Sequence, residues 1–250
     1  MLTPERHQVI LQLLKERDIV KIQELVELTN TSESTIRRDL SQLEAGKFLK
    51  RIHGGASRLQ GKLIEPSMVE KSSKNLHEKQ LIAQYAASLV EEGDCVYLDA
   101  GSTVREIIDY LPNKNIVVVT NGFMHVGPLL DKGITTYLIG GFVKQTTNAI
   151  IGRAAVVSLE LYRFDKCFIG VNGIHPDFGL TTPDQEEAAV KQKAISLSRE
   201  AYVLADESKF SEIAFAKIAE MKEAVIITNE LHEDTKNLYM GKTTIKVVTA

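Results

Sequence analysis

The chain is 250 residues long, with 30 basic and 33 acidic side chains and 44% hydrophobic residues. This length exceeds that of one typical domain, so we expect a small domain followed by a larger one, each with a buried core. No stretch approaches the roughly twenty apolar residues of a membrane span, and the N-terminus begins directly in a helix of mixed polarity, which together predict a soluble, cytoplasmic protein.

Apolar residues at helical spacing predict two short helices within the first 30 residues. The first spans residues 2–17 and the second residues 22–28, and in each the aliphatic side chains recur three or four positions apart. We therefore expect both helices to pack against a common core.

A third helix is predicted inside the stretch TSESTIRRDLSQLEAGKFLKRIHGG, residues 31–55. Ser32 is a suitable N-cap, because its hydroxyl can accept a hydrogen bond from an amide of the first turn. Ile36, Leu40 and Leu43 then recur at spacings of four and three, so one face of this helix is apolar.

A basic hairpin is predicted directly after this helix. Gly46 breaks the helix, residues 47–52 alternate as in a strand, and His-Gly-Gly at 53–55 supplies a turn. Such a hairpin can lie along a DNA groove or backbone. Three short helices followed by a basic wing is the order of a winged helix-turn-helix.

The start of the third helix carries short hydroxyls and arginines, which suit a DNA groove. Amides and hydroxyls near a helix N-terminus hold phosphates, while an arginine reaches the O6 and N7 acceptors of guanine. The alternative is an ordinary surface helix with a solvated charged face, and the neighbouring helices and wing favour DNA binding over it. The predicted DNA-binding residues are Ser32, Ser34, Thr35, Arg37, Arg38, Arg51, His53 and Gly54.

Net charge alone does not identify a DNA-binding protein here. Residues 1–60 contain ten basic and eight acidic side chains, a net charge of +2, which leaves −5 for the rest of the total of −3. The positions of the basic residues are therefore more informative than their number.

The remainder of the chain alternates short apolar strands with helices. A polar stretch at 58–77 predicts a linker, because it is interrupted by Gly61 and Pro66, and an amphipathic helix follows at 78–91. The predicted strands are 95–98, 116–119, 136–139, 166–169, 202–205, 224–228 and 244–248, and the predicted helices are 103–111, 123–131, 153–162, 184–200 and 230–239.

This alternation predicts a largely parallel sheet covered by helices, with a ligand at the carboxyl ends of the strands. The expected domains are residues 1–57, a linker at 58–77, and an α/β domain at 78–250. Cys95 and Cys167 fall in apolar strands, which predicts buried, reduced thiols, and we predict neither a metal site nor a cofactor.

Gly, Ser, Thr and Asn follow several of the predicted strands. Residues 99–103, D-A-G-S-T, open a helix, so amides, a helix dipole and two hydroxyls converge where a phosphate can bind. T-N-G at 120–122 and G-G at 140–141 occupy the equivalent place after the next two strands. Each turn alone is more often a simple strand-to-helix connection, but their coincidence at successive strand ends favours a binding site.

Charged residues follow the later strands. Glu186, Glu187 and Lys191 lie on one predicted helix, where they either bond sugar hydroxyls or form ordinary pairs one helical turn apart. Asp206 and Lys209 follow the next strand, and Lys209 can neutralise a phosphate, although a single surface lysine is usually only solvated.

Two groups of motifs resemble DeoR-type regulators of bacterial sugar metabolism. S-E-S-T-I-R-R-D-L, followed by L-x-R-x-H-G-G-A at 49–56, is similar to the DNA-binding domain of that family. D-A-G-S-T, T-N-G, I-G-G, G-V-N-G, the segment from G-L-T-T to E-E-A-x-V-K, and A-D-E-S-K-F resemble its sensor domain. The resemblance covers nearly the whole chain, apart from the linker and the C-terminal tail.

The resemblance implies a sensor domain similar to the ribose-5-phosphate isomerase and CoA transferase fold, which binds a phosphorylated sugar without converting it. It implies double-stranded operator DNA as a partner and a homodimer or homotetramer. The choice between Glu186 and Glu187 is open, and Asn172 stands where relatives often have an acidic residue. The implied ligand-binding residues are Asp99, Gly101, Ser102, Thr103, Thr120, Asn121, Gly122, Gly140, Gly141, Asn172, Glu186, Asp206 and Lys209.

The leading hypothesis is a sugar-phosphate-responsive repressor of a carbohydrate-use operon and not an enzyme, with fructose 1-phosphate or another hexose phosphate as the candidate effector. The linker region 62–80 is the expected transmission element. One alternative is a sugar-phosphate isomerase carrying a DNA-binding domain, with Glu186, Glu187 or Asp206 as the base. Another is a second domain that only assembles oligomers, which would make its glycines structural.

Overall fold

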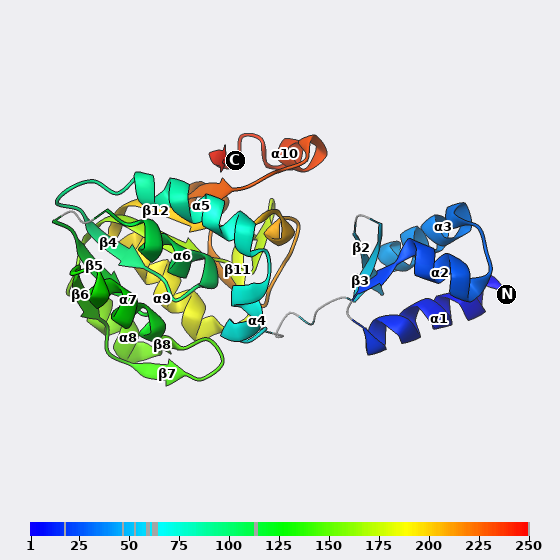
Figure 1. Ribbon diagram of the computed structural model, residues 1–250, viewed down its shortest axis with the longest axis horizontal. Helices are drawn as coiled ribbons and strands as arrows, with labels where there is room; N and C mark the ends of the chain where they lie inside the picture. The colour runs from blue at the N-terminus through cyan, green and yellow to red at the C-terminus, as the bar shows by residue number, and fades with distance from the viewer. Residues whose placement is uncertain are drawn as a thin grey trace. The chain divides into compact units, whose positions relative to one another are not determined.

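The computed structural model describes residues 1–17, 19–46, 48–52, 54–58, 61, 65–112 and 115–249. The chain divides into an N-terminal unit, Met1–Gly61, and a C-terminal unit, Lys62–Ala250 (Figure 1). No helix in these described ranges is long and apolar enough to cross a membrane.

The N-terminal unit is a winged helix-turn-helix, as predicted. Its three strands form an antiparallel sheet in the order β1-β3-β2, and β1 is too short to have been recognised from the sequence pattern. The elements are α1 (Thr3–Glu16), β1 (Ile19–Lys21), α2 (Ile22–Thr29), α3 (Glu33–Ala45), β2 (Leu49–Ile52) and β3 (Gly55–Arg58).

A single core joins the three helices to the wing. Ile10, Leu25 and Leu40, one from each helix, are fully buried together. The wing approaches so closely that a Cβ at Gly55 would lie 2.1 Å from the carbonyl oxygen of Val20, so only glycine fits this crossing.

A buried ion pair fixes α1 against α3. The Nε of Arg6 lies 2.7 Å from Oδ2 of Asp39, and Nη2 donates to Oδ1 at 3.1 Å. Both side chains are buried, and the bidentate geometry satisfies both carboxylate oxygens. The pair therefore defines the orientation of α3.

The C-terminal unit is built on a seven-stranded sheet in the order β15-β14-β12-β9-β4-β5-β6, with every pairing parallel. The strands are β4 (Cys95–Leu98), β5 (Val117–Thr120), β6 (Thr135–Leu138), β9 (Phe164–Gly170), β12 (Ser198–Leu204), β14 (Val225–Thr228) and β15 (Ile245–Val247). The predicted parallel sheet is confirmed.

Helices cover both faces of this sheet (Figure 1). On one face Val96 and Leu98 pack with Ile82 of α5 and Ile107 of α6. On the other face Tyr97, Cys167 and Ile169 pack with α8 and α9. The helices are α4 (Met68–Ser73), α5 (Leu76–Ser88), α6 (Ser102–Tyr110), α7 (Val126–Asp131), α8 (Arg153–Leu159), α9 (Gln185–Ser196) and α10 (Glu233–Tyr239), with short 3-10 turns η1 (Phe123–His125), η2 (Glu207–Lys209) and η3 (Met221–Glu223).

Smaller sheets were missed by the sequence pattern, because their strands are only three or four residues long. β7 (Phe142–Lys144) and β8 (Ala149–Ile151) form a hairpin. A second antiparallel sheet joins β10 (Gly173–His175), β11 (Gly179–Thr182) and β13 (Ala216–Ala219).

Two predicted segments differ from the structure. The predicted helix 184–200 is too long, since α9 ends at Ser196 and β12 begins at Ser198. The segment 58–77, expected to be a linker, contains α4, which begins at a capping box between Ser67 and Glu70. Residues 65–77 therefore carry ordered structure that belongs to the C-terminal unit.

Candidate functional site

The recognition helix α3 begins as its sequence predicts. Oγ of Ser32 accepts a hydrogen bond from the amide of Thr35 at 3.3 Å and lies 3.0 Å from Oγ of Ser34. Ser32 and Ser34 are exposed and Thr35 is half-buried. The three hydroxyls are therefore grouped at the helix N-terminus, where they and the free amides can hold a phosphate.

The exposed face of α3 is polar and opposes its buried face of Ile36 and Leu40. Arg37 and Arg38 are both exposed. Arg37 is engaged by Glu33, with Nη2 2.6 Å from Oε1, whereas no ion pair ties Arg38 within the described residues. Arg38 is thus the more available of the two arginines for DNA.

The wing is attached to the end of α3. Nη1 of Arg51 donates to Oγ of Ser41 at 2.8 Å, and the amide of Arg51 donates to Oε1 of Glu44 at 2.8 Å. Gly54 is exposed at the tip with a φ of 78°, a conformation that favours glycine. The predicted residue His53 lies outside the described residues.

In the C-terminal unit the strand order reverses between β4 and β9. From β4 the sheet continues through β5 to β6, and from β9 it continues the other way through β12 and β14 to β15. The crevice at the carboxyl ends of strands on either side of such a reversal is where open α/β sheets bind ligands. The loops after β4 and β9 define this position.

Asp99 holds these two loops together. Its Oδ2 accepts a hydrogen bond from the amide of Gly170 at 3.0 Å and pairs with the Nζ of Lys191 from α9. Asp99 and Lys191 are 1% and 5% exposed. A Cβ at Gly101 would lie only 3.4 Å from Cα of Gly170, so the two loops run side by side.

The N-terminus of α6 carries unpaired polar groups beside this pair. Gly101 is the N-cap and provides no side chain to bond the first-turn amides. Ser102 and Thr103 are buried, and in the described part of the chain no hydrogen bond engages their hydroxyls. Free amides, two hydroxyls and the positive end of the helix dipole together favour an anion.

Two lysines whose charges interact, Lys79 of α5 beside α6 and Lys209 of η2, have ammonium groups that lack a close carboxylate. Burial lowers the pKa of Lys209, with a smaller opposing effect from Asp206, and burial likewise lowers the pKa of Lys79. No carboxylate of the described residues lies within 4.0 Å of either ammonium, and Nζ of Lys79 donates to the carbonyl of Lys71. A bound anion would compensate both charges.

Asp206 organises the loop that carries Lys209. Burial would raise the pKa of Asp206, but the nearby Lys209 and hydrogen bonds from Ser208 and Asn75 lower it overall. Nδ2 of Asn75 donates to Oδ1 at 3.1 Å, and the amide of Ser208 donates to the same oxygen at 3.0 Å. Asp206 is therefore a positioning carboxylate that links α5 to this loop.

The residues at the end of β5 support the neighbouring loop after β4, and their polar side chains are hydrogen-bonded within the protein. Oδ1 of Asn121 accepts the amide of Ala100 at 2.9 Å, and Oγ1 of Thr120 donates to the carbonyl of Leu98 at 2.6 Å. A Cβ at Gly122 would lie 2.6 Å from the buried His125 ring. Thr120, Asn121 and Gly122 thus hold the loop after β4 in place.

Of three further predicted residues, Gly141 is held by packing, Asn172 is engaged by a hydrogen bond, and a Cβ at Gly140 would meet no described residue. A Cβ at Gly141 would lie 2.8 Å from both Cγ2 of Ile150 and the carbonyl oxygen of Ile151, and Gly140 is exposed. Oδ1 of Asn172 accepts a hydrogen bond from Oγ1 of Thr182 at 3.1 Å. Gly140 and Gly141 follow β6, which lies two strands away from β4, so they do not belong to the candidate site at the strand reversal.

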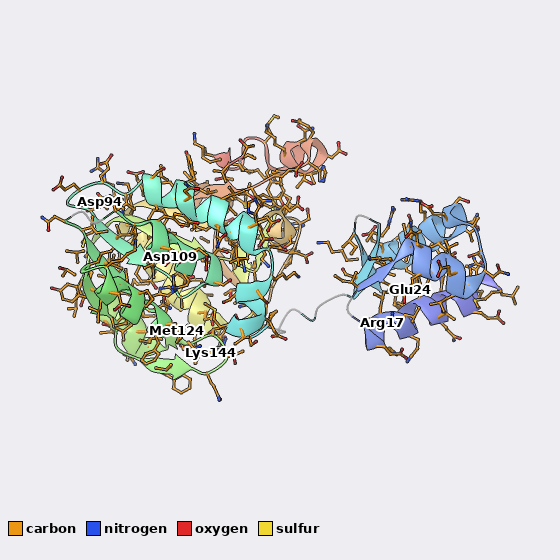
Figure 2. All side chains as sticks on the ribbon, viewed as in Figure 1. Arg17, Glu24, Asp94, Asp109, Met124 and Lys144 are labelled. Atoms are coloured by element: carbon orange, nitrogen blue, oxygen red, sulfur yellow. The ribbon has the colours of Figure 1, made fainter. Side chains whose placement is uncertain are left out.

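Of the two adjacent glutamates, Glu187 faces the interior and Glu186 is exposed. The choice of Glu186 therefore changes to Glu187, whose Oε1 accepts hydrogen bonds from Oγ1 of Thr147 at 2.8 Å and Nζ of Lys144 at 3.1 Å. Lys144 (Figure 2) also pairs with Glu65 and, at 2.8 Å, with Asp184. Residue 65 is thereby bound to the start of α9.

The list of implied ligand-binding residues left out Lys79, Lys191 and Glu187, although Glu187 and Lys191 had been considered as partners for sugar hydroxyls. Lys79 looked like one charged residue on an amphipathic helix, and the pairing of Lys191 with Asp99 spans 92 positions. The spacing of four between Glu187 and Lys191 left open a surface pair or a role in binding sugar hydroxyls, and in the structure each has a separate buried partner.

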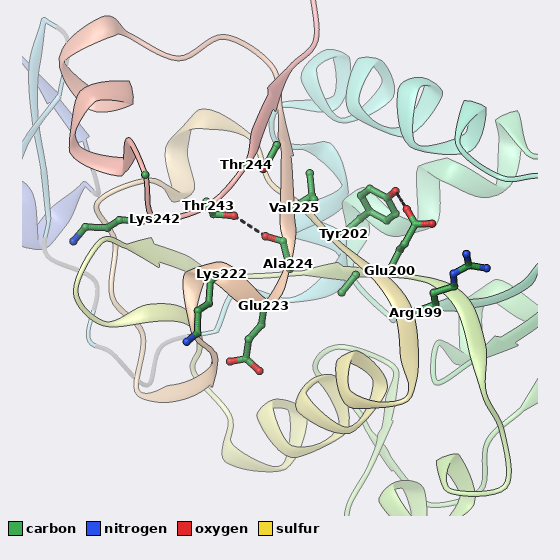
Figure 3. Close-up of a pocket in the computed structure, with 12 residues that line it drawn as sticks. Arg199, Glu200, Tyr202, Lys222, Glu223, Ala224, Val225, Lys242, Thr243 and Thr244 are labelled. Carbon is green, nitrogen blue, oxygen red and sulfur yellow. Dashed lines mark hydrogen bonds between the residues drawn. The ribbon is translucent and has the colours of Figure 1, made fainter.

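A hollow of about 550 Å³ lies elsewhere, at the amino ends of β12, β14 and β15 (Figure 3). Arg199, Glu200, Lys222 and Glu223 stand around it and are exposed. It lies at the amino ends of the strands, whereas open α/β sheets bind ligands at the carboxyl ends, so the strand reversal beside Asp99 is the better candidate site.

Comparison with solved structures gives a distant likeness. Ribose 5-phosphate isomerase A from Methanocaldococcus jannaschii is 20% identical, with 55% of each chain covered and a TM-score of 0.42. At this level the likeness says nothing about activity.

Two curated relatives match nearly end to end. The "Uncharacterized HTH-type transcriptional regulator FruR" of Bacillus subtilis (strain 168) is 58% identical over 249 residues, 99% of each chain. The "Lactose phosphotransferase system repressor" of Staphylococcus aureus (strain NCTC 8325 / PS 47) is 34% identical over 248 residues, 98% of each chain.

Family models match both units. Residues 6–61 match the DeoR-like helix-turn-helix domain, and residues 74–230 match the DeoR C terminal sensor domain. With both modules in this order, and with relatives that are regulators over their whole length, the chain belongs to the DeoR family of DNA-binding transcriptional regulators.

Proposed function

We propose that this regulator represses a carbohydrate-use operon in the cytoplasm and that a phosphorylated sugar bound by the C-terminal unit releases it from operator DNA. The observation that carries the proposal is the N-terminus of α6, where the hydroxyls of Ser102 and Thr103 have no hydrogen-bond partner among the described residues. Helix α5, which packs against α6, brings the buried Lys79, whose charge interacts with that of Lys209. The name of the staphylococcal relative, a sugar-system repressor, supports the same assignment. Fructose 1-phosphate and other hexose phosphates are the candidate effectors.

The phosphate would occupy the α6 N-terminus, and the sugar hydroxyls would lie toward the loops after β9 and β12. Because burial lowers the pKa values of both lysines, a dianionic group placed between them would stabilise their charged forms. Asp99 and Asp206 are acceptors that can bond sugar hydroxyls, if binding opens their present hydrogen bonds. No step of this proposal requires the sugar to react.

Contacts of helix α9 connect the candidate site to Glu65, near the start of the C-terminal unit. Lys191 contacts Asp99 in the pocket, and Glu187, one turn earlier, contacts Lys144, which also pairs with Glu65. Glu65 lies three residues after Lys62, where the C-terminal unit begins, so it is close in sequence to the N-terminal unit. A coupling of only about 1–3 kcal/mol along this path would change operator affinity by roughly 5- to 150-fold.

A panel of phosphorylated sugars tests the proposal on the full chain, with thermal unfolding and operator binding measured side by side. A ligand at about 100 times its Kd adds roughly 2.7 kcal/mol to the stability of the state that binds it. We expect a hexose phosphate both to raise the Tm and to weaken operator binding. A panel in which no sugar phosphate changes either quantity would refute the sensor role.

Ser102→Ala sharpens this test, because it removes one hydroxyl from the proposed phosphate site without breaking a hydrogen bond in the free protein. We expect operator affinity to stay unchanged while the Tm shift and the release by ligand are lost. Ser196→Ala, at an exposed serine of α9, is the matched control and should respond like the wild type. Conversion of an aldose phosphate to a ketose phosphate by the purified protein would instead favour an enzyme.

A further inference from the structure

Large apolar side chains are exposed around the edge strand β6. Phe142 of β7 is 68% exposed, Leu161 after α8 is 80% exposed, and Tyr137 of β6 is 48% exposed. Figure 1 shows β6, β7, α7 and α8 together at one end of the C-terminal unit. We call this the β6 surface and define it by Leu130, Tyr137, Leu138, Phe142, Val157 and Leu161.

Two contacts tie β6 and the loop after it to α8 within this surface. The rings of Tyr137 and Tyr162 lie 5.8 Å apart, which joins β6 to the end of α8. The amide of Gly140 donates to Oγ of Ser158 at 3.4 Å, which ties the loop after β6 to the same helix. Contiguous exposed apolar patches of this kind mark interaction sites.

The free edge of β6 is short, but it carries neither the charges nor the prolines that usually protect an edge strand against pairing. β6 bonds to β5 on one side, and no other strand in the described ranges occupies its outer edge. Residues 133–143 contain no charged side chain. Natural proteins normally guard an exposed edge strand with charges, prolines or a covering segment, so this edge is built to be covered.

We propose that a second copy of this chain covers the β6 surface, with the two β6 strands antiparallel across a two-fold axis. In such an interface residue i of one copy faces residue j of the other and j faces i, so an uncharged strand brings no unpaired or like charges to the contact. Around this surface lie side chains of both charges, since Asp131 on α7 and Arg163 after α8 are exposed. In a two-fold pair, an acidic side chain of one copy can then meet a basic side chain of the other.

Paired copies also suit the DNA-binding unit. A helix-turn-helix usually reads two half-sites through a symmetric dimer, and one chain supplies one recognition helix. The inference adds a surface to the proposed homo-oligomer, and its test uses neither DNA nor ligand. It can therefore fail while the sugar-phosphate switch stands.

Sedimentation equilibrium of the full chain, over a range of concentrations, tests this surface. The wild type is expected to dimerise, and Leu138→Lys is expected to weaken dimerisation by roughly 30-fold or more, because each copy would then have to bury a lysine in the interface. Phe142→Lys, in a separate element, should act in the same direction. Leu238→Lys on α10, where the leucine is 56% exposed, is the matched control and should leave the dimer unchanged.

Circular dichroism and thermal unfolding of each variant show that the units remain folded. Dimerisation lost in Leu138→Lys and Phe142→Lys but kept in Leu238→Lys would support the proposal. A monomeric wild type would overturn it. An assembly that both β6-surface variants leave intact would overturn it as well.

Discussion

The recognition helix and the pocket of the C-terminal unit place their polar residues in opposite ways. On α3, Arg38 and Ser34 are exposed, and the buried Asp39 serves only to hold the helix. At the strand reversal, Asp99 and Lys191 are themselves buried and bonded to each other. A DNA surface keeps its contacts solvated until binding, whereas a small-ligand pocket must assemble its groups inside the fold.

On α3, the exposed residues proposed to bind DNA are therefore not the residues that stabilise the fold. At the strand reversal, the same buried residues would serve both purposes. A substitution on the exposed face of α3 should change DNA binding and leave folding intact. A substitution at the buried pair should change folding first, because an unpaired buried charge is costly. The following four predictions test this contrast, from the largest expected effect to the smallest.

Lys191→Met should lower the free energy of unfolding by about 3–5 kcal/mol, because it leaves the buried carboxylate of Asp99 without its cation. Urea unfolding of the full chain measures the change. Lys193→Met, on the same helix, removes the partly exposed pair with Glu160, 2.7 Å long, and should cost no more than about 1 kcal/mol. Equal losses of unfolding free energy in the two variants would contradict the contrast between the buried and the partly exposed ion pair.

His125 should make the C-terminal unit less stable at acidic pH. Burial lowers its pKa to about 4, and its Nε2 has no hydrogen-bond partner among the described residues. The unfolded chain takes up a proton near pH 6.5, but the folded chain does so only near pH 4, so stability falls by about 3 kcal/mol as the pH drops between these values.

Urea unfolding at pH 7 and at pH 4.5 measures this loss. His125→Gln should remove most of it, and His77→Gln, at an exposed position on α5, should leave it unchanged. A pH dependence that persists in His125→Gln would assign the effect to other groups.

Arg38→Ala should weaken operator binding by about 1–3 kcal/mol if the side chain reads a base, with no change in unfolding free energy. Arg17→Ala is the control, because Arg17 is exposed in the same unit and pairs with Glu24 at 2.5 Å (Figure 2). Operator titrations at fixed salt measure both variants. Identical losses in the two would show that only net charge matters.

Arg37→Ala should have a smaller direct effect on stability, about 0.3–0.5 kcal/mol, because its pair with Glu33 is exposed and one turn apart. Its effect on DNA binding distinguishes two roles. A loss independent of sequence would indicate a phosphate contact, and a loss confined to one base position would indicate base reading. An unchanged footprint would remove Arg37 from the interface.

The sequence predicted α3 well because its information is local. The spacing of Ile36, Leu40 and Leu43 defines the buried face, and a serine marks the N-cap, so the exposed arginines follow directly. The parallel sheet was also predictable, since each strand is a short apolar run between helices. In both cases each helix or strand shows its own pattern within one short stretch of sequence.

The pocket was predicted only in part, because its contacts join distant segments. The turn at 99–103 was recognisable, but nothing near it indicates that Lys191 would supply the cation. The choice between Glu186 and Glu187 depends on how α9 lies on the sheet, which helical spacing does not determine. Gly141 was predicted to bind ligand, yet the close approach of Ile150 already explains why a glycine stands at this position.

The pair between Arg6 and Asp39 also bears on how the chain folds during synthesis. It joins residues only 33 positions apart, so the N-terminal unit can close as soon as its first 60 or so residues have left the ribosome. The central sheet must wait longer, because β4 cannot pair with β9 until residue 166 has been made. The domain that binds DNA is therefore complete while the domain that controls it is still being translated.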